Sequence, residues 1–241
     1  MDIKKLEWLD LMVETRRLTL VALLASVYAV GSLIPGFPMI GAPDSKIDIV
    51  RSLEICYGLV LGPVLGPSAA FLGAIVGKTL TGGGIGLFFT PLSIVSSLMA
   101  ASMKRHTLLR LRGWMFSAVL LSCLIAGWYA TPTGREAPLY PIPHLIGLGV
   151  ILLLRDKVTG YLNCREKGKL TLGLLLSGYP STMAGHMLGN LIFIHLFSPG
   201  PLFFMAILPV SIMERIALTI IATLIGVPLI ITVRNVLPEL D

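Results

Sequence analysis

The sequence predicts an all-α integral membrane protein built as a polytopic helical bundle. Of its 241 residues, 55% are hydrophobic and only 13% are charged, and the mean hydropathy is +0.86. A soluble domain has about 25% charged residues, and a disordered chain has few apolar ones. The net charge of +6 lies in short basic clusters between apolar runs, which is typical of membrane topology. We therefore expect the lipid bilayer as a partner, and no nucleic acid.

Eight apolar runs divide the chain. A helix that crosses a bilayer needs about 20 apolar residues, and fewer where the bilayer is locally thin. The second and third runs could instead form a re-entrant pair joined at Gly62-Pro63, so six and eight spans both remain open. In chain order, the runs cover about residues 18–33, 49–61, 64–80, 85–103, 114–130, 144–154, 170–197 and 202–233.

The basic residues predict the orientation of these runs. If all eight runs span, 14 of the 19 basic residues fall on one side, within residues 4–17, 104–112 and 155–169 and at Arg234. Basic loops are retained on the cytoplasmic side of a membrane. Both termini are therefore expected in the cytoplasm, and an outward loop at residues 35–48, rich in turn formers, is either a lid or a plain connector.

The chain carries no recognisable catalytic motif. It has no HExxH, no GxSxG and no Walker A sequence, and its three cysteines are far apart. We therefore predict no catalytic residue, no metal site and no cofactor, and we do not expect an enzyme. If the protein takes part in active transport, ATP is hydrolysed by another subunit.

Polar side chains inside the runs are candidates for function, because they are expensive in lipid. In the seventh run, Tyr179, His186 and Asn190 lie seven and four residues apart and so share one helix face. In the eighth run, Glu214 precedes Arg215. The alternatives are hydrogen bonds between helices for the first three and a self-paired ion couple for the last two.

Further polar candidates lie near the outer ends of the runs. Asp48, Arg51 and Glu54 follow one another at a spacing of three, and Lys78 ends the third run. The alternatives are a surface network at the outer rim and a lysine that snorkels to water. Together these positions predict one outward-facing pocket for a small molecule, lined by Asp48, Glu54, Lys78, Phe89, Tyr179, His186, Asn190 and Glu214. For Phe89, membrane-interface anchoring is the alternative.

Small residues recur along the first run. Ala22, Ala25, Ser26 and Ala29 form overlapping small-xxx-small patterns, which allow helices to approach closely. Ordinary packing within the bundle is one interpretation. The other is a docking face for a second membrane subunit.

The segments RLTLVALLASVYAV and IDIVRSLEICYGLVLGPVLGPSAAFLGAIVGKTL resemble the substrate-binding S component of energy-coupling factor (ECF) vitamin transporters. In that family the first helix carries AxxxA-like motifs that dock a membrane coupling subunit, and the pairs Ala22/Ser26 and Ala25/Ala29 match them. The Gly-Pro at 62–63 and a small-residue third helix that ends at Lys78 also fit. The last two runs, with Asn190 and Pro209, resemble the fifth and sixth helices of riboflavin-type members.

The resemblance covers about residues 18–103 and 170–233, and it implies four parts. Residues 1–17 are a cytoplasmic leader, either a solvated tail or an amphipathic turn on the membrane. Residues 18–103 hold core helices one to four with the loop at 35–48, and residues 170–241 hold core helices five and six with the tail. Residues 104–169 hold basic loops and an inserted two-helix segment, which gives eight spans in all.

The function implied by the resemblance is the high-affinity capture of a vitamin or a related cofactor precursor at the cell membrane. Its partners would be the vitamin-like ligand, a membrane coupling subunit and two cytoplasmic ATPase subunits. A self-sufficient secondary transporter, with Glu214 as its ion-coupling acid, is the alternative. A membrane enzyme that uses His186, His195 and Glu214 is a weaker one.

Overall fold

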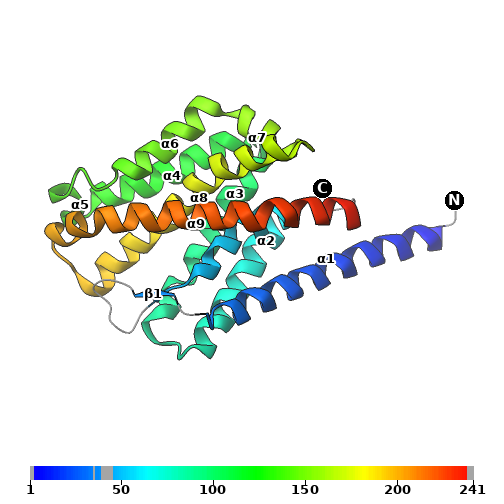
Figure 1. The fold of residues 1–241 in the computed structure, drawn as a ribbon, viewed down its shortest axis with the longest axis horizontal. Coiled ribbons are helices and arrows are strands. Elements are labelled where there is room, and N and C mark those ends of the chain that lie inside the picture. Colours follow the sequence, from blue (N-terminus) through cyan, green and yellow to red (C-terminus); the bar gives the residue numbers. More distant parts are fainter. Residues whose placement is uncertain (1–2, 35, 39–45, 238–241) are drawn as a thin grey trace.

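The computed structural model describes residues 3–34, 36–38 and 46–237, and this part of the chain is almost entirely helical (Figure 1). The all-α prediction is therefore confirmed. The strands form two short antiparallel pairs, β1 (Phe37–Pro38) with β2 (Lys46–Ile47) and β3 (Thr107–Leu108) with β4 (Leu111–Arg112). The helices are α1 (Ile3–Gly31), α2 (Ser52–Leu80), α3 (Pro91–Lys104), α4 (Gly113–Ala130), α5 (Pro132–Glu136), α6 (Ile142–Leu154), α7 (Asp156–Asn163), α8 (Lys167–Phe197) and α9 (Pro201–Val236), with short 3-10 helices at Ile49–Arg51 and Gly84–Phe89.

Four helical segments of the described chain are long and apolar enough to cross a membrane. They are Ile49–Leu80, Gly84–Lys104, Gly113–Ala130 and Pro201–Val236, and Ile142–Leu154 is a shorter apolar helix. Large apolar side chains also cover the outside of the bundle, and Leu153 and Leu202 are each 82% exposed. Such a surface suits lipid rather than water, so the chain is a helical membrane protein.

Helix α2 reverses direction at Gly62. This glycine has φ +82° and ψ −169°, a conformation that a residue with a side chain rarely adopts, and Pro63 follows it at the start of the second arm. A Cβ built on Gly66 would lie 2.6 Å from the Tyr57 carbonyl oxygen. In a continuous helix, residues nine apart are separated by about 13 Å. The second and third predicted runs therefore form a helical hairpin.

Helix α1 packs against both arms of this hairpin. Tyr28 donates a hydrogen bond to Glu54 of the first arm at 2.9 Å, and Gly73 of the second arm lies against Tyr28 and the carbonyl of Ala25. The helix begins at Ile3, so the predicted leader continues it rather than forming a separate element. Figure 1 shows this part of α1 extending beyond the bundle, at the same end as the C-terminus.

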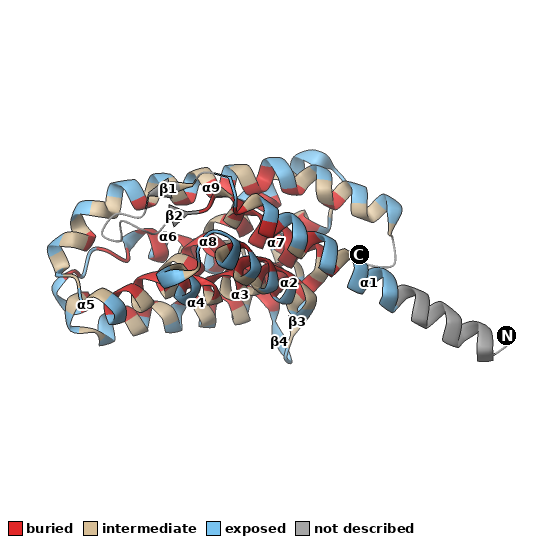
Figure 2. Cartoon of the chain, turned by 90° about the horizontal axis from the view of Figure 1, so that it is seen from below, coloured by how far each residue is buried: buried red, intermediate tan, exposed pale blue. Residues whose placement is uncertain are grey.

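Close helix contacts at glycines build the centre of the bundle. Gly58 of α2 lies against the backbone of Ser97 on α3, and Gly185 of α8 lies against Ser96. Helix α9 crosses over α2 and α8, where the Cys56 thiol donates to the Ala222 carbonyl at 3.3 Å. Figure 2 shows the buried residues along the inner faces of these helices and the exposed ones outside.

Residues 104–169 pack on the far side of α8 and contain four helices, two longer and two short. Helix α6 approaches α8 at Gly147, which faces Pro180, and α4 contacts both of them. The short α7 lies against the end of α3, where the Thr159 hydroxyl donates to the Met103 carbonyl at 2.9 Å. The segment predicted as an insertion is thus an integral layer of the bundle.

Candidate functional site

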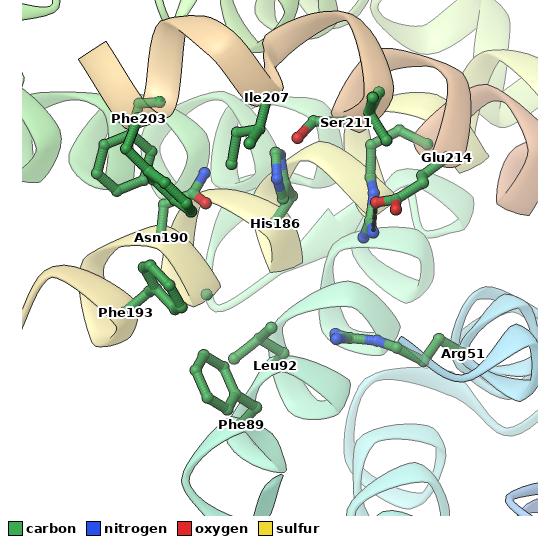
Figure 3. Close-up of a pocket in the computed structure, with 14 residues that line it drawn as sticks. Arg51, Phe89, Leu92, His186, Asn190, Phe193, Phe203, Ile207, Ser211 and Glu214 are labelled. Carbon is green, nitrogen blue, oxygen red and sulfur yellow. Dashed lines mark hydrogen bonds and ion pairs between the residues drawn. The ribbon is translucent and has the colours of Figure 1, made fainter. Parts of the chain in front are cut away.

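A cavity of about 80 Å³ lies where the start of α2, the start of α3, α8 and α9 meet (Figure 3). One end is aromatic, with Phe193 and Phe203, and the other end carries Arg51 and Glu214. Its polar lining residues are Arg51, His186, Asn190, Ser211, Glu214 and Arg215. Its apolar ones are Phe89, Leu92, Phe193, Phe203, Phe204, Ile207 and Val210.

Helical spacing places these side chains on two facing stripes. On α9, the lining positions 203–204, 207, 210–211 and 214–215 recur every three or four residues, and on α8 positions 186, 189–190 and 193 do the same. Gly189 lets α8 approach α3, since a Cβ there would lie 2.8 Å from Leu92. Pro201 occupies the first turn of α9, a position that suits proline, and so fixes where the second stripe begins.

The charged end of the cavity consists of buried ion pairs. Arg51 pairs with Glu54 at 3.3 Å, and Arg215 pairs with its neighbour Glu214 at 3.3 Å. Glu54 is 2% exposed and Arg215 is 3% exposed. Buried charges persist only when they are paired and hydrogen-bonded. The interpretation of Asp48, Arg51 and Glu54 as a solvated surface network is therefore wrong, whereas the self-pairing of Glu214 with Arg215 is confirmed.

A second, smaller cavity of about 20 Å³ adjoins the first and shares Arg51 and Phe89 with it. Behind these residues, the Lys78 ammonium and the Asp48 carboxylate meet at 2.7 Å. Lys78 therefore points into the protein and does not snorkel to water. The other polar residues lining this cavity are Tyr28, Glu54, Thr90 and Ser93.

Several buried polar atoms around the first cavity have no hydrogen-bond partner among the described residues. They include Nδ2 of Asn190, Nδ1 of His186 and Nε of Arg215. An unsatisfied buried donor costs about 1–3 kcal/mol. Such groups mark the place where a ligand or ordered water completes the structure.

The α5–α6 segment supplies a back wall that sequence reasoning missed. His144, which is 1% exposed, stacks on His186 with ring centroids 5.3 Å apart and an angle of 10° between the planes. The Tyr140 ring lies 6.3 Å from that of His186. The Tyr140 hydroxyl faces the side chains of Ser211 and Asn190 without closing a hydrogen bond to either, and neither nitrogen of His144 has a partner among the described residues. The signal in the sequence was a polar aromatic pair flanking the prolines at 141 and 143.

The structure brings seven of the eight predicted pocket residues to these two cavities. Phe89, His186, Asn190 and Glu214 line the first, and Asp48, Glu54, Lys78 and again Phe89 line the second. The exception is Tyr179, whose hydroxyl donates to the Pro143 carbonyl at 3.0 Å and so bonds α8 to α6. Sequence reasoning missed Arg51 as a cavity residue, although its spacing to Asp48 and Glu54 was the available signal. Ser211 had no such signal.

The structure describes the four predicted docking residues but only part of the predicted lid. Residues 35 and 39–45 of the lid lie outside the described part of the chain. On α1, Ala25 and Ala29 face Gly73 and Gly77 of α2, so these two alanines serve packing within the chain. Ala22 and Ser26 are exposed.

The polar groups of the site suit binding. Within the described residues, no group of three or more histidine, cysteine or acidic side chains is arranged to hold a metal ion. The carboxylates of Glu54 and Glu214 are engaged by arginines, and the unpartnered nitrogens point to a ligand that accepts hydrogen bonds.

The chain has a distant similarity to a known protein. The chain is similar to the uncharacterized protein MJ0923 of Methanocaldococcus jannaschii, with 28% identity over 193 residues, which is 77% of this chain and 61% of that protein. The chain thus spans about three fifths of the relative's length. No protein-family model matches the chain, and no solved structure matches it.

Proposed function

We propose that this protein is the substrate-capture subunit of an ATP-driven micronutrient uptake system in the cell membrane, of the ECF S-component type. The observation that supports it best is the first cavity, where residues from four distant parts of the chain surround unpartnered buried donors. A largely apolar cavity with a few convergent polar groups is the usual form of a small-molecule site. The ligand is a vitamin or a related cofactor precursor.

The proposal includes eight membrane-spanning segments with both termini in the cytoplasm. The turn of the α2 hairpin supports this arrangement, because Gly62 lies beside Arg105, in the basic segment that follows α3. Asp48 and Lys78 meet at the opposite end of the same hairpin. The cavity lies toward that end, and basic loops stay in the cytoplasm. The cavity therefore opens toward the outside.

A membrane coupling subunit and two cytoplasmic ATPase subunits complete the proposed transporter. The exposed Ala22 and Ser26 of α1 offer a face of small residues on which another transmembrane helix can pack closely. Ala25 and Ala29 of the same stripe are already used against α2. The proposed docking face is therefore centred on the first pair.

The test is native mass spectrometry of the gently purified protein, followed by extraction and identification of bound small molecules. We expect one bound compound per chain in the wild type. Asn190→Ala should lose it, whereas the control Asn235→Ala, at an exposed asparagine near the C-terminal end of α9, should keep it. A protein that is empty as purified, and still empty after incubation with a panel of vitamins and precursors, would contradict the proposal.

A second experiment separates capture from self-sufficient transport, which the partly buried Glu214 at the cavity wall would favour. Uptake of the identified compound is measured in cells that lack the ATPase subunits. The capture proposal expects uptake to stop. Uptake that continues without them but collapses with a protonophore would assign the protein to secondary transport, with Glu214 as the coupling acid.

A further inference from the structure

We infer that the ligand of the first cavity is a small, single-ring compound with a carboxylate, which lies between Arg51 and Arg215 while the ring packs among the phenylalanines. This inference rests on the proposed function, because it specifies the ligand of the same site. It follows from the charge of the lining, the unpartnered donors, and the shape and size of the aromatic end.

Two guanidiniums reach the wall of the cavity, although each of them also pairs with a carboxylate. Two guanidiniums, Arg51 and Arg215, face it, but only one carboxylate, Glu214, does so. Glu54 lies on the other side of Arg51, where it accepts the hydrogen bond of Tyr28. Two like charges that line one small cavity repel each other. A carboxylate placed between the two guanidiniums would lower this repulsion and accept hydrogen bonds that the two ion pairs leave unmade.

The donors of the site lack an acceptor. Nε of Arg215 and Nδ2 of Asn190 are buried and have no partner among the described residues. Both nitrogens can only donate hydrogen bonds. A charged acceptor forms hydrogen bonds roughly twice as strong as a neutral one, and a carboxylate matches the fork of a guanidinium. The Asn190 amide, nearer the aromatic end in Figure 3, is available to an acceptor on the ring.

The aromatic end is suited to a flat ring. Phe193 and Phe203 stack with centroids 5.5 Å apart and an angle of 11° between the planes, and Phe204 stands edge-on to Phe203 at 5.4 Å. Aromatic rings favour such stacked and edge-on neighbours. The cavity holds about 80 Å³, whereas sites for drug-sized ligands hold about 300–1,000 Å³. The space fits one ring better than a fused system such as a flavin.

The first test compares benzoate with benzamide, which has the same ring and nearly the same shape but no charge. Binding of each probe to the purified protein is measured by calorimetry and by the shift in the unfolding temperature. We expect benzoate to bind at least about tenfold more tightly, as the difference between a charged and a neutral acceptor implies. Equal binding of the two probes, or no binding of benzoate in the millimolar range, overturns the inference.

The second test uses variants that keep the local charge balanced, because removal of one arginine alone would leave a buried carboxylate unpaired. The double variant Glu214→Gln/Arg215→Gln should lose the preference for benzoate over benzamide. The double variant Arg51→Gln/Glu54→Gln should weaken it in the same direction. The control is Arg165→Gln, at an exposed arginine, which should bind both probes like the wild type. A preference that survives both double variants contradicts the assignment.

The identity of a co-purified compound distinguishes this inference from the proposed function. A bound compound that is neutral, cationic or polycyclic overturns the single-ring carboxylate and leaves the capture function standing. A protein that binds benzoate through the arginines, yet supports no uptake with any ATPase partner, overturns the capture function and leaves the ligand class standing.

Discussion

The Lys78 ammonium and the Asp48 carboxylate meet at 2.7 Å, at the open end of the α2 hairpin. Asp48 precedes the first arm and Lys78 lies in the last turn of the second arm. The ion pair therefore joins the two ends of the hairpin, which are 30 positions apart in the chain. It also lies directly behind Arg51, which connects the two cavities.

We expect Lys78→Met to destabilise the protein. The Asp48 side chain is 7% exposed, so removal of the lysine leaves its carboxylate buried without this partner. Breaking a buried pair costs about 3–5 kcal/mol, and the 18% exposure of Lys78 places the loss near the lower limit. The measurement is the midpoint of thermal unfolding in a mild detergent.

The control for this prediction is the double variant Asp48→Asn/Lys78→Met, which removes both charges together. It should recover much of the lost stability, because no unpaired charge remains buried. If the double variant is as unstable as the sum of the two single variants, the ion pair contributes nothing of its own.

Gly58 and Gly62 should both resist substitution by alanine, for different reasons. A Cβ on Gly58 would lie 2.0 Å from the Ser97 carbonyl oxygen, so Gly58→Ala must push α3 away from α2. Gly62 has φ +82°, and Gly62→Ala should cost about 1–3 kcal/mol in backbone strain. Gly149→Ala is the matched control, because nothing lies within 4 Å of its Cβ position. Unfolding temperatures of the two variants close to that of the control would disprove the hairpin geometry.

Tyr179→Phe should separate packing from ligand binding on α8. It removes the hydrogen bond to the Pro143 carbonyl, which should cost about 1 kcal/mol of stability. It should leave the affinity for the bound compound unchanged, because Tyr179 does not line either cavity. Asn190→Ala should show the reverse, with lost affinity and little loss of stability. Loss of affinity in Tyr179→Phe would show that Tyr179 contributes to ligand binding.

The sequence was sufficient for the helical class and for most of the candidate site. Apolar runs predict membrane helices because no other regular element satisfies its backbone within a lipid-facing segment as readily. Buried polar residues such as His186 and Asn190 could be found because lipid makes them expensive. Their positions at a spacing of four also predicted that they share a face, and both line the first cavity.

The remaining features depend on contacts that a single sequence does not encode. The stacking of His144 on His186 joins helices α6 and α8, and neither residue carries a local sign of the other. The burial of Arg51 follows from the fold of the hairpin, since the same charged triplet would be solvated at the end of an isolated helix. The division of the α1 alanines between packing and exposure likewise depends on where α2 returns.

That division gives the last prediction, which concerns docking. Ala22→Trp adds bulk to an exposed position of α1, so it should leave ligand binding and stability close to the wild type and strongly reduce uptake. Ala25→Trp should instead destabilise the isolated protein, because Ala25 is half-buried and its backbone carbonyl lies against Gly73 of α2. Leu153→Trp, at an 82% exposed position on α6, controls for the effect of a bulky side chain in lipid. Binding, unfolding temperature and cellular uptake are measured for all three variants. Uptake by Ala22→Trp equal to that of Leu153→Trp would show that this face of α1 docks no partner.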